Sequence, residues 1–515
     1  MTTCISRHVV PLVPLALQQA AFHVVLLIAL MSREDAASST VVLMPRAEVQ
    51  QYMDMQLGMF LHFGLNTFTG QQSGDGNATR HPASAFAPTN LSATQWIDTA
   101  KSLGAKYVCL TAQHEGGFTL WNSSYTNYSS VTAIGRDVLT EFVDAANAGG
   151  LSTCIYFSVS CDAYHGCPMG KCDTERWFID MKLGQLRELL GGKYGKFSYM
   201  WTDHANGDPL FANVTALANQ LQPQMLILGQ DVQTIGSEYG YLWFDQLWNQ
   251  DNTTKTWTGK GPAANEMTTG GPLDPPLSLG GMPDGAYWKS READKTISSS
   301  GWFWNTGAKP DSVVSLMDLY LRSVGLGSNL ILNLPPDRSG QIGNSFVDVA
   351  RRFGAGVSAM YKTVVAGVFN VSGPVVTIDL AHNASVSMVE LREDMTAGGQ
   401  KIAGFVVEAW DDQYGVMRWY QIGSGSTVGN QRIVMSPYAH IDDKRKGLTH
   451  AARGQQRHIR ANPGALLASK WRVRVTATAG PGKNKQVVFR SVRLFAPENA
   501  VPETCFTIGA PKVCV

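Results

Sequence analysis

The sequence lacks an excess of charge of either sign. It carries 42 Lys and Arg residues against 41 Asp and Glu residues in 515 residues, a formal net charge of +1. Proteins that bind polyanions usually present a basic surface, so this balance argues against a nucleic-acid partner. The only dense charge run, residues 442–446, mixes both signs and is typical of a solvated loop.

Long apolar runs are also absent after the N-terminal region. Arg7 and His8 precede two apolar stretches within residues 9–31, and small residues follow at 36–39. This order predicts a signal peptide over residues 1–39, with an open cleavage point and a membrane anchor as the alternative. No later segment reaches membrane-spanning length, so we expect no stable membrane insertion once the signal is removed.

Sequons of the form Asn-x-Ser/Thr support export. Each is weak alone, but eight of them in a chain with a signal-like start predict a glycoprotein. We therefore expect a secreted protein, or one of a lysosome- or vacuole-like compartment. The sequon asparagines are Asn77, Asn90, Asn122, Asn127, Asn213, Asn252, Asn370 and Asn383.

The cysteines fit an oxidising compartment, where loop cysteines form disulfides. Those predicted to pair are Cys161, Cys167, Cys172, Cys505 and Cys514, with the last two as the preferred pair. His165 lies among the first three, but their spacing does not match a zinc finger. Cys109 and Cys154 lie in apolar runs, and we expect them to be buried thiols.

Residues 44–357 alternate short apolar runs with amphipathic stretches, which predicts a parallel sheet with helical crossovers. At this length a closed (β/α)₈-like barrel is favoured. The alternative is an open doubly wound sheet, but the sequence has no Gly-rich phosphate loop after an early strand. The predicted strands are Met59–Phe63, Tyr107–Thr111, Ser152–Val159, Ser198–Thr202, Met225–Leu228 and Asn329–Leu334. The predicted helices are Trp96–Leu103, Val138–Ala148, Trp177–Leu190, Ala216–Leu221 and Leu316–Val324.

Two further regions complete the predicted organisation. Residues 252–287 are rich in Gly, Pro, Thr and Asn, and we interpret them as a long loop over the barrel opening. Residues 366–515 contain short, β-branched, alternating runs separated by turns, which predicts an all-β sandwich of jelly-roll type.

Polar residues end several predicted strands. In a barrel these ends meet on one side, so His62, His114, Glu115, Tyr156 and Asp203 are expected to converge there. Aromatic residues surround them in the sequence, and aromatic rings stack well on the C–H faces of sugars. These aromatic residues are Phe63, Trp121, Trp201, Trp288, Trp302 and Trp304.

Glycoside cleavage requires two carboxyl groups, one ionised and one able to supply a proton. Asp203 ends a predicted strand, although it could instead cap the next helix. Glu292 follows the long loop and could equally be a surface residue beside Arg291. Spacing alone does not choose Glu292 over Glu238, Glu115 or Asp294.

Six segments in order resemble glycoside hydrolase family 29, the α-L-fucosidases, and most closely its plant-type and fungal members. They are MFLHFGLNTFT at 59–69, LTAQHEGGF at 110–118 followed by Trp121, WTD at 201–203, Trp288 with Glu292 and Asp294, GWFW at 301–304, and LILNLPPDRSG at 330–340. The resemblance covers about 280 residues and continues weakly into the β region.

The resemblance implies a (β/α)₈-like barrel, a C-terminal β-sandwich, and an exo-α-L-fucosidase that retains anomeric configuration by double displacement. In this interpretation Asp203 is the nucleophile and Glu292 the acid/base. No metal or organic cofactor is implied, and the partner is a fucosylated oligosaccharide or glycoprotein. The residues expected to contact the substrate are His62, His114, Glu115, Tyr156, Trp121, Trp201 and Trp302.

The sequence departs from the family pattern in the sugar-contact set. Glu115 and Gly116 replace the second His and the Asp of the His-His-Asp segment, Gln72 and Ser73 replace a Glu-Trp pair, and Ser299 and Ser300 replace an Arg-Pro pair. Two alternatives therefore stay open: a lectin-like protein that binds fucosylated glycans without cleaving them, and a hydrolase of a related sugar such as L-galactose. No Gly-x-Ser-x-Gly elbow supports a serine hydrolase.

Overall fold

A computed structural model describes residues 45–497 except 74–80, 169, 204–208, 236–241, 243–246, 252–280, 282, 284–286, 397, 412–416, 437–465 and 480–485, together with the backbone of 505–507 and 512–514. One compact unit spans residues 43–515. The predicted signal peptide and most of the predicted loop at 252–287 lie outside the described residues. Within the described part of the chain, no helix combines the length and apolarity needed to cross a bilayer.

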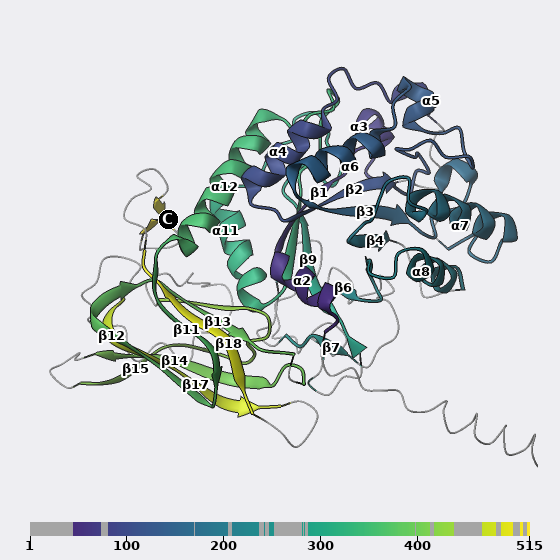
Figure 1. Cartoon of the computed structure of the whole chain (residues 1–515). Helices are drawn as coiled ribbons and strands as arrows, with labels where there is room; N and C mark the ends of the chain where they lie inside the picture. The colour runs from purple at the N-terminus through teal and green to yellow at the C-terminus, as the bar shows by residue number, and fades with distance from the viewer. Residues whose placement is uncertain are drawn as a thin grey trace, which may run out of the picture. The chain divides into compact units, whose positions relative to one another are not determined.

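An eight-stranded, nearly closed parallel sheet forms the first half of the compact unit (Figure 1). The strand order is β5-β4-β3-β2-β1-β10-β9-β6, and a parallel bridge between Leu228 and Val232 joins the two edges. This sheet confirms the predicted barrel. The strands are β1 Leu57–Leu61, β2 Tyr107–Gln113, β3 Ser152–Ser158, β4 Tyr199–Asp203, β5 Leu226–Ile227, β6 Val232–Thr234, β9 Ser290–Thr296 and β10 Asn329–Asn333.

Helices cover the outer face of the barrel (Figure 1). The α-helices are α2 Ala47–Met55, α3 Leu65–Thr69, α4 Ala93–Leu103, α5 Ser130–Ile134, α6 Val138–Gly149, α7 Arg176–Leu190, α8 Pro209–Leu221, α11 Val313–Leu321 and α12 Asn344–Lys362. The 3₁₀ turns are η1 Ala83–Ala85, η2 Ala163–His165 and η3 Val324–Leu326. Local sequence sets the bounds of α4. Ser92 accepts a hydrogen bond from the Gln95 N–H, and Gly104 ends the helix at φ 88°.

The second half is a β-sandwich whose two antiparallel sheets follow the orders β11-β18-β13-β16 and β12-β17-β14-β15. Alternate residues of both sheets, among them Phe405, Trp471 and Phe489, form one buried core. The strands are β11 Val364–Ser372, β12 Val375–Val386, β13 Met388–Glu393, β14 Ile402–Asp411, β15 Arg418–Gly425, β16 Arg432–Met435, β17 Leu466–Thr478 and β18 Val488–Phe495. Two small ribbons, β7 Gln250–Asp251 with β8 Tyr287–Trp288 and β19 Cys505–Thr507 with β20 Lys512–Cys514, complete the strands.

The cysteine predictions are partly wrong. Cys109 and Cys154 are partners in the register of the neighbouring strands β2 and β3 and form a disulfide, so they are not buried thiols. Cys167 bonds to Cys172, and Cys161 stays a buried free thiol. The described residues contain no group of three or more His, Cys, Asp or Glu that could hold a metal ion.

The hairpin of β19 and β20 places Cys505 opposite Cys514 in its backbone register. The side chains of both residues lie outside the described part of the chain. The predicted pairing of these two cysteines therefore stays a prediction.

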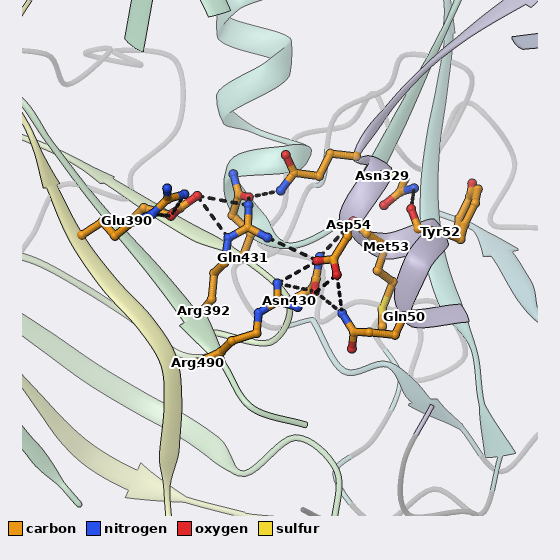
Figure 2. A network of polar contacts seen from close by, with 12 residues as sticks. Gln50, Tyr52, Met53, Asp54, Asn329, Glu390, Arg392, Asn430, Gln431 and Arg490 are labelled. Atoms are coloured by element: carbon orange, nitrogen blue, oxygen red, sulfur yellow. Dashed lines mark hydrogen bonds and ion pairs between the residues drawn. The ribbon is translucent and has the colours of Figure 1, made fainter. Parts of the chain in front are cut away.

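A polar network joins helix α2 to the sandwich (Figure 2). Asp54 accepts hydrogen bonds from Arg490 of β18 at 2.7 Å and from Arg392 of β13 at 3.3 Å. The amide of Asn430 donates to the Met53 carbonyl at 2.9 Å. Asn329 of the barrel donates to the carbonyl of Tyr52 at 2.7 Å. The helix is thus bonded to both halves of the compact unit.

Glu393 is a buried carboxyl at the end of β13, only 2% exposed. Burial raises its pKa from 4.5 to about 7, although backbone N–H groups of Lys401, Ile402 and Gly429 partly oppose this. A raised folded-state pKa gives stability that is complete below the unfolded pKa and lost as pH rises through the folded pKa.

We predict that Glu393→Gln makes the free energy of unfolding less dependent on pH. Between about pH 5 and pH 8 the wild type should lose unfolding free energy by up to roughly 3 kcal/mol more than the variant, as the pKa difference implies. Urea unfolding at several pH values measures the two slopes. Parallel slopes would contradict a shifted pKa at Glu393.

Candidate active site

Side chains alternate along β4, and every second one points into the barrel. Tyr199, Trp201 and Asp203 share this inner face, because Tyr199 and Trp201 both bond to the buried Glu292. Asp203 is the last residue of the strand and is partly exposed. It therefore lies at the carboxyl-terminal end of the barrel, which we call the rim.

Tyr156 of β3 lies beside Asp203. Its hydroxyl donates a hydrogen bond to Asp203 Oδ2 at 2.7 Å, and its side chain is only 1% exposed. Burial and the charge of Asp203 both hold the pKa of Tyr156 well above 10, so the phenol keeps its proton. Tyr156 is therefore the donor and Asp203 the acceptor in this bond.

His62, just beyond the end of β1, is a buried neutral imidazole. Burial lowers its pKa from 6.5 to about 3, against a small opposing effect of Asn333. Its Nδ1 lies 2.9 Å from Asn333 Oδ1, which also accepts the His62 backbone N–H. Because the amide oxygen can only accept, Nδ1 donates, and Nε2 keeps a lone pair that can accept a hydrogen bond.

Aromatic rings line the same end of the barrel. The His114 ring stacks on Tyr156 at 5.2 Å with an interplanar angle of 16°. Trp302, partly exposed, has its ring centroid 4.9 Å from that of His62. Phe303 meets both histidine rings edge-on. These contacts bring together His62, His114, Tyr156, Trp201, Asp203 and Trp302, which we call the rim cluster.

Gln72 fixes the segment that carries Trp302. Its amide accepts the Phe303 N–H at 2.9 Å and donates to the Phe303 carbonyl at 3.0 Å. Gly301 has φ 99°, and a Cβ there would lie 2.5 Å from the Gln72 side chain. The departure from the family pattern at Gln72 thus has a structural role at the rim.

The structure does not place Glu292 at the rim. Glu292 lies within β9, is 0% exposed, and pairs in register with Asn329, the first residue of β10. It accepts hydrogen bonds from the side chains of Tyr52, Tyr107, Tyr199 and Trp201. Tyr107 and Tyr199 begin their strands, so these groups form the inner floor of the barrel. We call Glu292 and the three tyrosines the floor cluster.

Glu115 and Trp121 follow β2 but differ in setting. Glu115 is partly exposed, and its charge contributes to the raised pKa of Tyr156. Trp121 is fully buried, and its indole N–H donates at 3.0 Å to Glu188 of α7, outside the barrel. Trp121 therefore packs between the barrel and α7, and its predicted substrate contact stays a prediction.

The three floor tyrosines were not singled out as functional residues from the sequence. Tyr107 and Tyr199 look like ordinary strand residues, and Tyr52 precedes every recognisable segment. The sequence signal for Tyr199 was that positions 199, 201 and 203 alternate along one predicted strand and so face the same side.

Comparison with known proteins shows the family. The sequence profile of the α-L-fucosidase family matches residues 67–359. An α-L-fucosidase of Arabidopsis thaliana, α-L-fucosidase 1, is 32% identical over 437 residues, which cover 76% of this chain and 81% of the plant protein. This chain belongs to the α-L-fucosidase family.

Solved structures agree with this family membership. The crystal structure of SpGH29 superposes with a TM-score of 0.71 at 26% identity, covering 88% of this α-L-fucosidase and 98% of that chain. A Ruminococcus gnavus fucosidase of glycoside hydrolase family 29, solved with fucose, superposes with a TM-score of 0.69 over 88% of this chain and 95% of its own. Its 21% identity supports the fold alone.

We predict that His62 adds no titration to the activity of the fucosidase between about pH 4 and pH 7, because its folded pKa is about 3. His62→Phe keeps a ring but has no acceptor, so it should lower kcat/KM by about 10- to 100-fold through loss of the hydroxyl contact expected at Nε2. The shape of the pH profile should stay the same. A change of kcat/KM near pH 6 in the wild type that is absent from the variant would contradict a neutral His62.

Proposed function

We propose that this enzyme is a retaining exo-α-L-fucosidase that acts on fucosylated oligosaccharides or glycoproteins, with Asp203 as its nucleophile. The observation that carries the proposal is the bond from the buried Tyr156 to Asp203 at the end of β4. Tyr156 keeps its proton and donates this bond, and the Asp203 carboxyl that accepts it is partly exposed at the rim. Attack on the anomeric carbon would break its bond to the aglycone oxygen, which leaves with a proton from the acid/base, and would form a covalent fucosyl ester. Water would then cleave this ester and release fucose.

The rest of the rim cluster suits a deoxyhexose. Neutral His62 offers an acceptor at Nε2, and His114 lies beside it with ring centroids 5.7 Å apart. Trp302 and Trp201 provide apolar ring surface for the C–H face and methyl group of fucose. Binding thus depends on neutral hydrogen-bonding groups and aromatic faces, which fits an uncharged sugar.

We propose that the acid/base is a carboxyl group just beyond the carboxyl-terminal end of a barrel strand, at the rim. Glu292 does not suit the role, since proton exchange with a leaving oxygen and with water requires access to both. Two other candidates from the sequence follow strands two places from β4 on either side: Glu115 after β2 and Glu238 after β6. Glu115 is partly exposed, and Glu238 lies outside the described residues.

Replacement of Asp203 tests the nucleophile. Asp203→Ala should lower kcat on an aryl α-L-fucoside by at least about 10³-fold, because no ester can form. The wild type should release α-fucose first, as followed by proton NMR of the fresh product. First release of β-fucose, or undiminished turnover by the variant, would overturn the double displacement.

The same assay assigns the acid/base. Of Glu115→Gln, Glu238→Gln and Glu292→Gln, one of the first two should lose activity mainly on substrates with poor leaving groups. Azide should restore that variant by attacking the fucosyl ester, and the product should be a fucosyl azide of retained configuration. Rescue of the Glu292 variant instead would return this role to Glu292.

We also propose that the enzyme is secreted, or delivered to a lysosome- or vacuole-like compartment, as a glycoprotein. In support, all six sequon asparagines within the described residues are exposed: Asn90, Asn122, Asn127, Asn213, Asn370 and Asn383. Glycopeptide mapping of protein from the medium of a eukaryotic host should find glycans at several of them. Retention of an unglycosylated protein in the cytosol would contradict the proposal.

A further inference from the structure

Glu292 is the common acceptor of four hydrogen bonds from three elements. Tyr52 of α2 and Tyr107 of β2, the latter at 2.7 Å, donate to Oε2. Tyr199 and Trp201 of β4 donate to Oε1 at 3.1 Å and 2.9 Å. Each carboxyl oxygen therefore already has two donors, and the side chain has no exposed surface. Such a fully bonded buried group is suited to fixing its neighbours.

The neighbour that matters for the reaction is Trp201. Its ring lies 15° from parallel with Tyr156 at 5.7 Å, and it meets Phe60 at 5.6 Å. Tyr156 in turn donates to Asp203. The indole N–H bond to Glu292 sets the rotation of Trp201 about its side-chain bonds. Two stacked rings therefore connect Glu292 to the nucleophile.

Tyr52, which donates to Glu292, is held in place by the contacts of helix α2. The next two residues, Met53 and Asp54, bond to the sandwich, and Asn329 of the barrel bonds to the Tyr52 carbonyl. Figure 2 shows this arrangement, with Tyr52 and Asn329 on one side of the helix and Arg392 and Arg490 on the other. The position of the Tyr52 hydroxyl is thus fixed independently of the rim.

We propose that Glu292 is a positioning residue that holds the Trp201 indole and, through Tyr156, the orientation of Asp203. This inference rests on the proposed function, in which Asp203 is the nucleophile. It assigns Glu292 no proton transfer to or from the substrate. Misplacement of catalytic groups by about 1 Å can cost about 100-fold in rate, so the effect is measurable.

The test is a double-mutant cycle on intact enzyme with Glu292→Gln, Trp201→Phe and both together. Phe keeps an aromatic face but cannot donate to Glu292. Glu292→Gln alone should lower kcat/KM by about 100-fold, mainly through kcat, with the same factor for aryl fucosides of different leaving-group acidity. In the Trp201→Phe background it should cost less than about 3-fold, because the bond is already absent.

A matched control is Glu393→Gln, which alters an equally buried carboxyl in the sandwich and should leave kcat/KM unchanged. If Glu292→Gln does not fold, Tyr199→Phe in a cycle with Trp201→Phe carries the same test, since Tyr199 shares Oε1 with Trp201.

Three results would overturn the inference: additive losses in the cycle, azide rescue with leaving-group dependence, or an undiminished kcat/KM. An active Asp203→Ala enzyme would instead refute the proposed nucleophile. The failures of the two proposals are therefore distinguishable.

Discussion

The alternation of side chains along β4 is the constraint on which the site depends. Because every second residue of a strand faces the same side, Tyr199, Trp201 and Asp203 follow one another from the floor to the rim of one barrel. Parallel pairing then places Tyr156 of β3 beside this column. A single register thus determines which groups are buried and which can meet a sugar.

Floor and rim use the same residue types for different purposes. At the floor, burial raises the pKa of Glu292, while its four donors partly offset that cost. At the rim, Asp203 accepts a hydrogen bond from the buried Tyr156 and stays partly exposed. Position relative to solvent, more than the identity of the acid, therefore decides which carboxyl can act on a substrate.

The sequence predicted those elements that carry an apolar pattern. Strands β2 to β4 were found within a few residues, and the barrel followed from their spacing. Strand β9, Ser290–Thr296, was missed because its polar residues find their partners only after folding. For the same reason Glu292 could be recognised in a motif, but its full burial inside the barrel could not be predicted. The bond between Cys109 and Cys154 likewise depends on the register of two strands.

If Asp203 is the nucleophile, its side chain forms a covalent bond to fucose during the reaction. Incubation with a 2-deoxy-2-fluoro-α-L-fucosyl donor slows cleavage of the ester, so that digestion and mass spectrometry can locate the sugar. We expect one fluorofucosyl group, on the peptide that contains Asp203 and on that side chain. A label on a different carboxylate, or full inactivation without any covalent label, would contradict it.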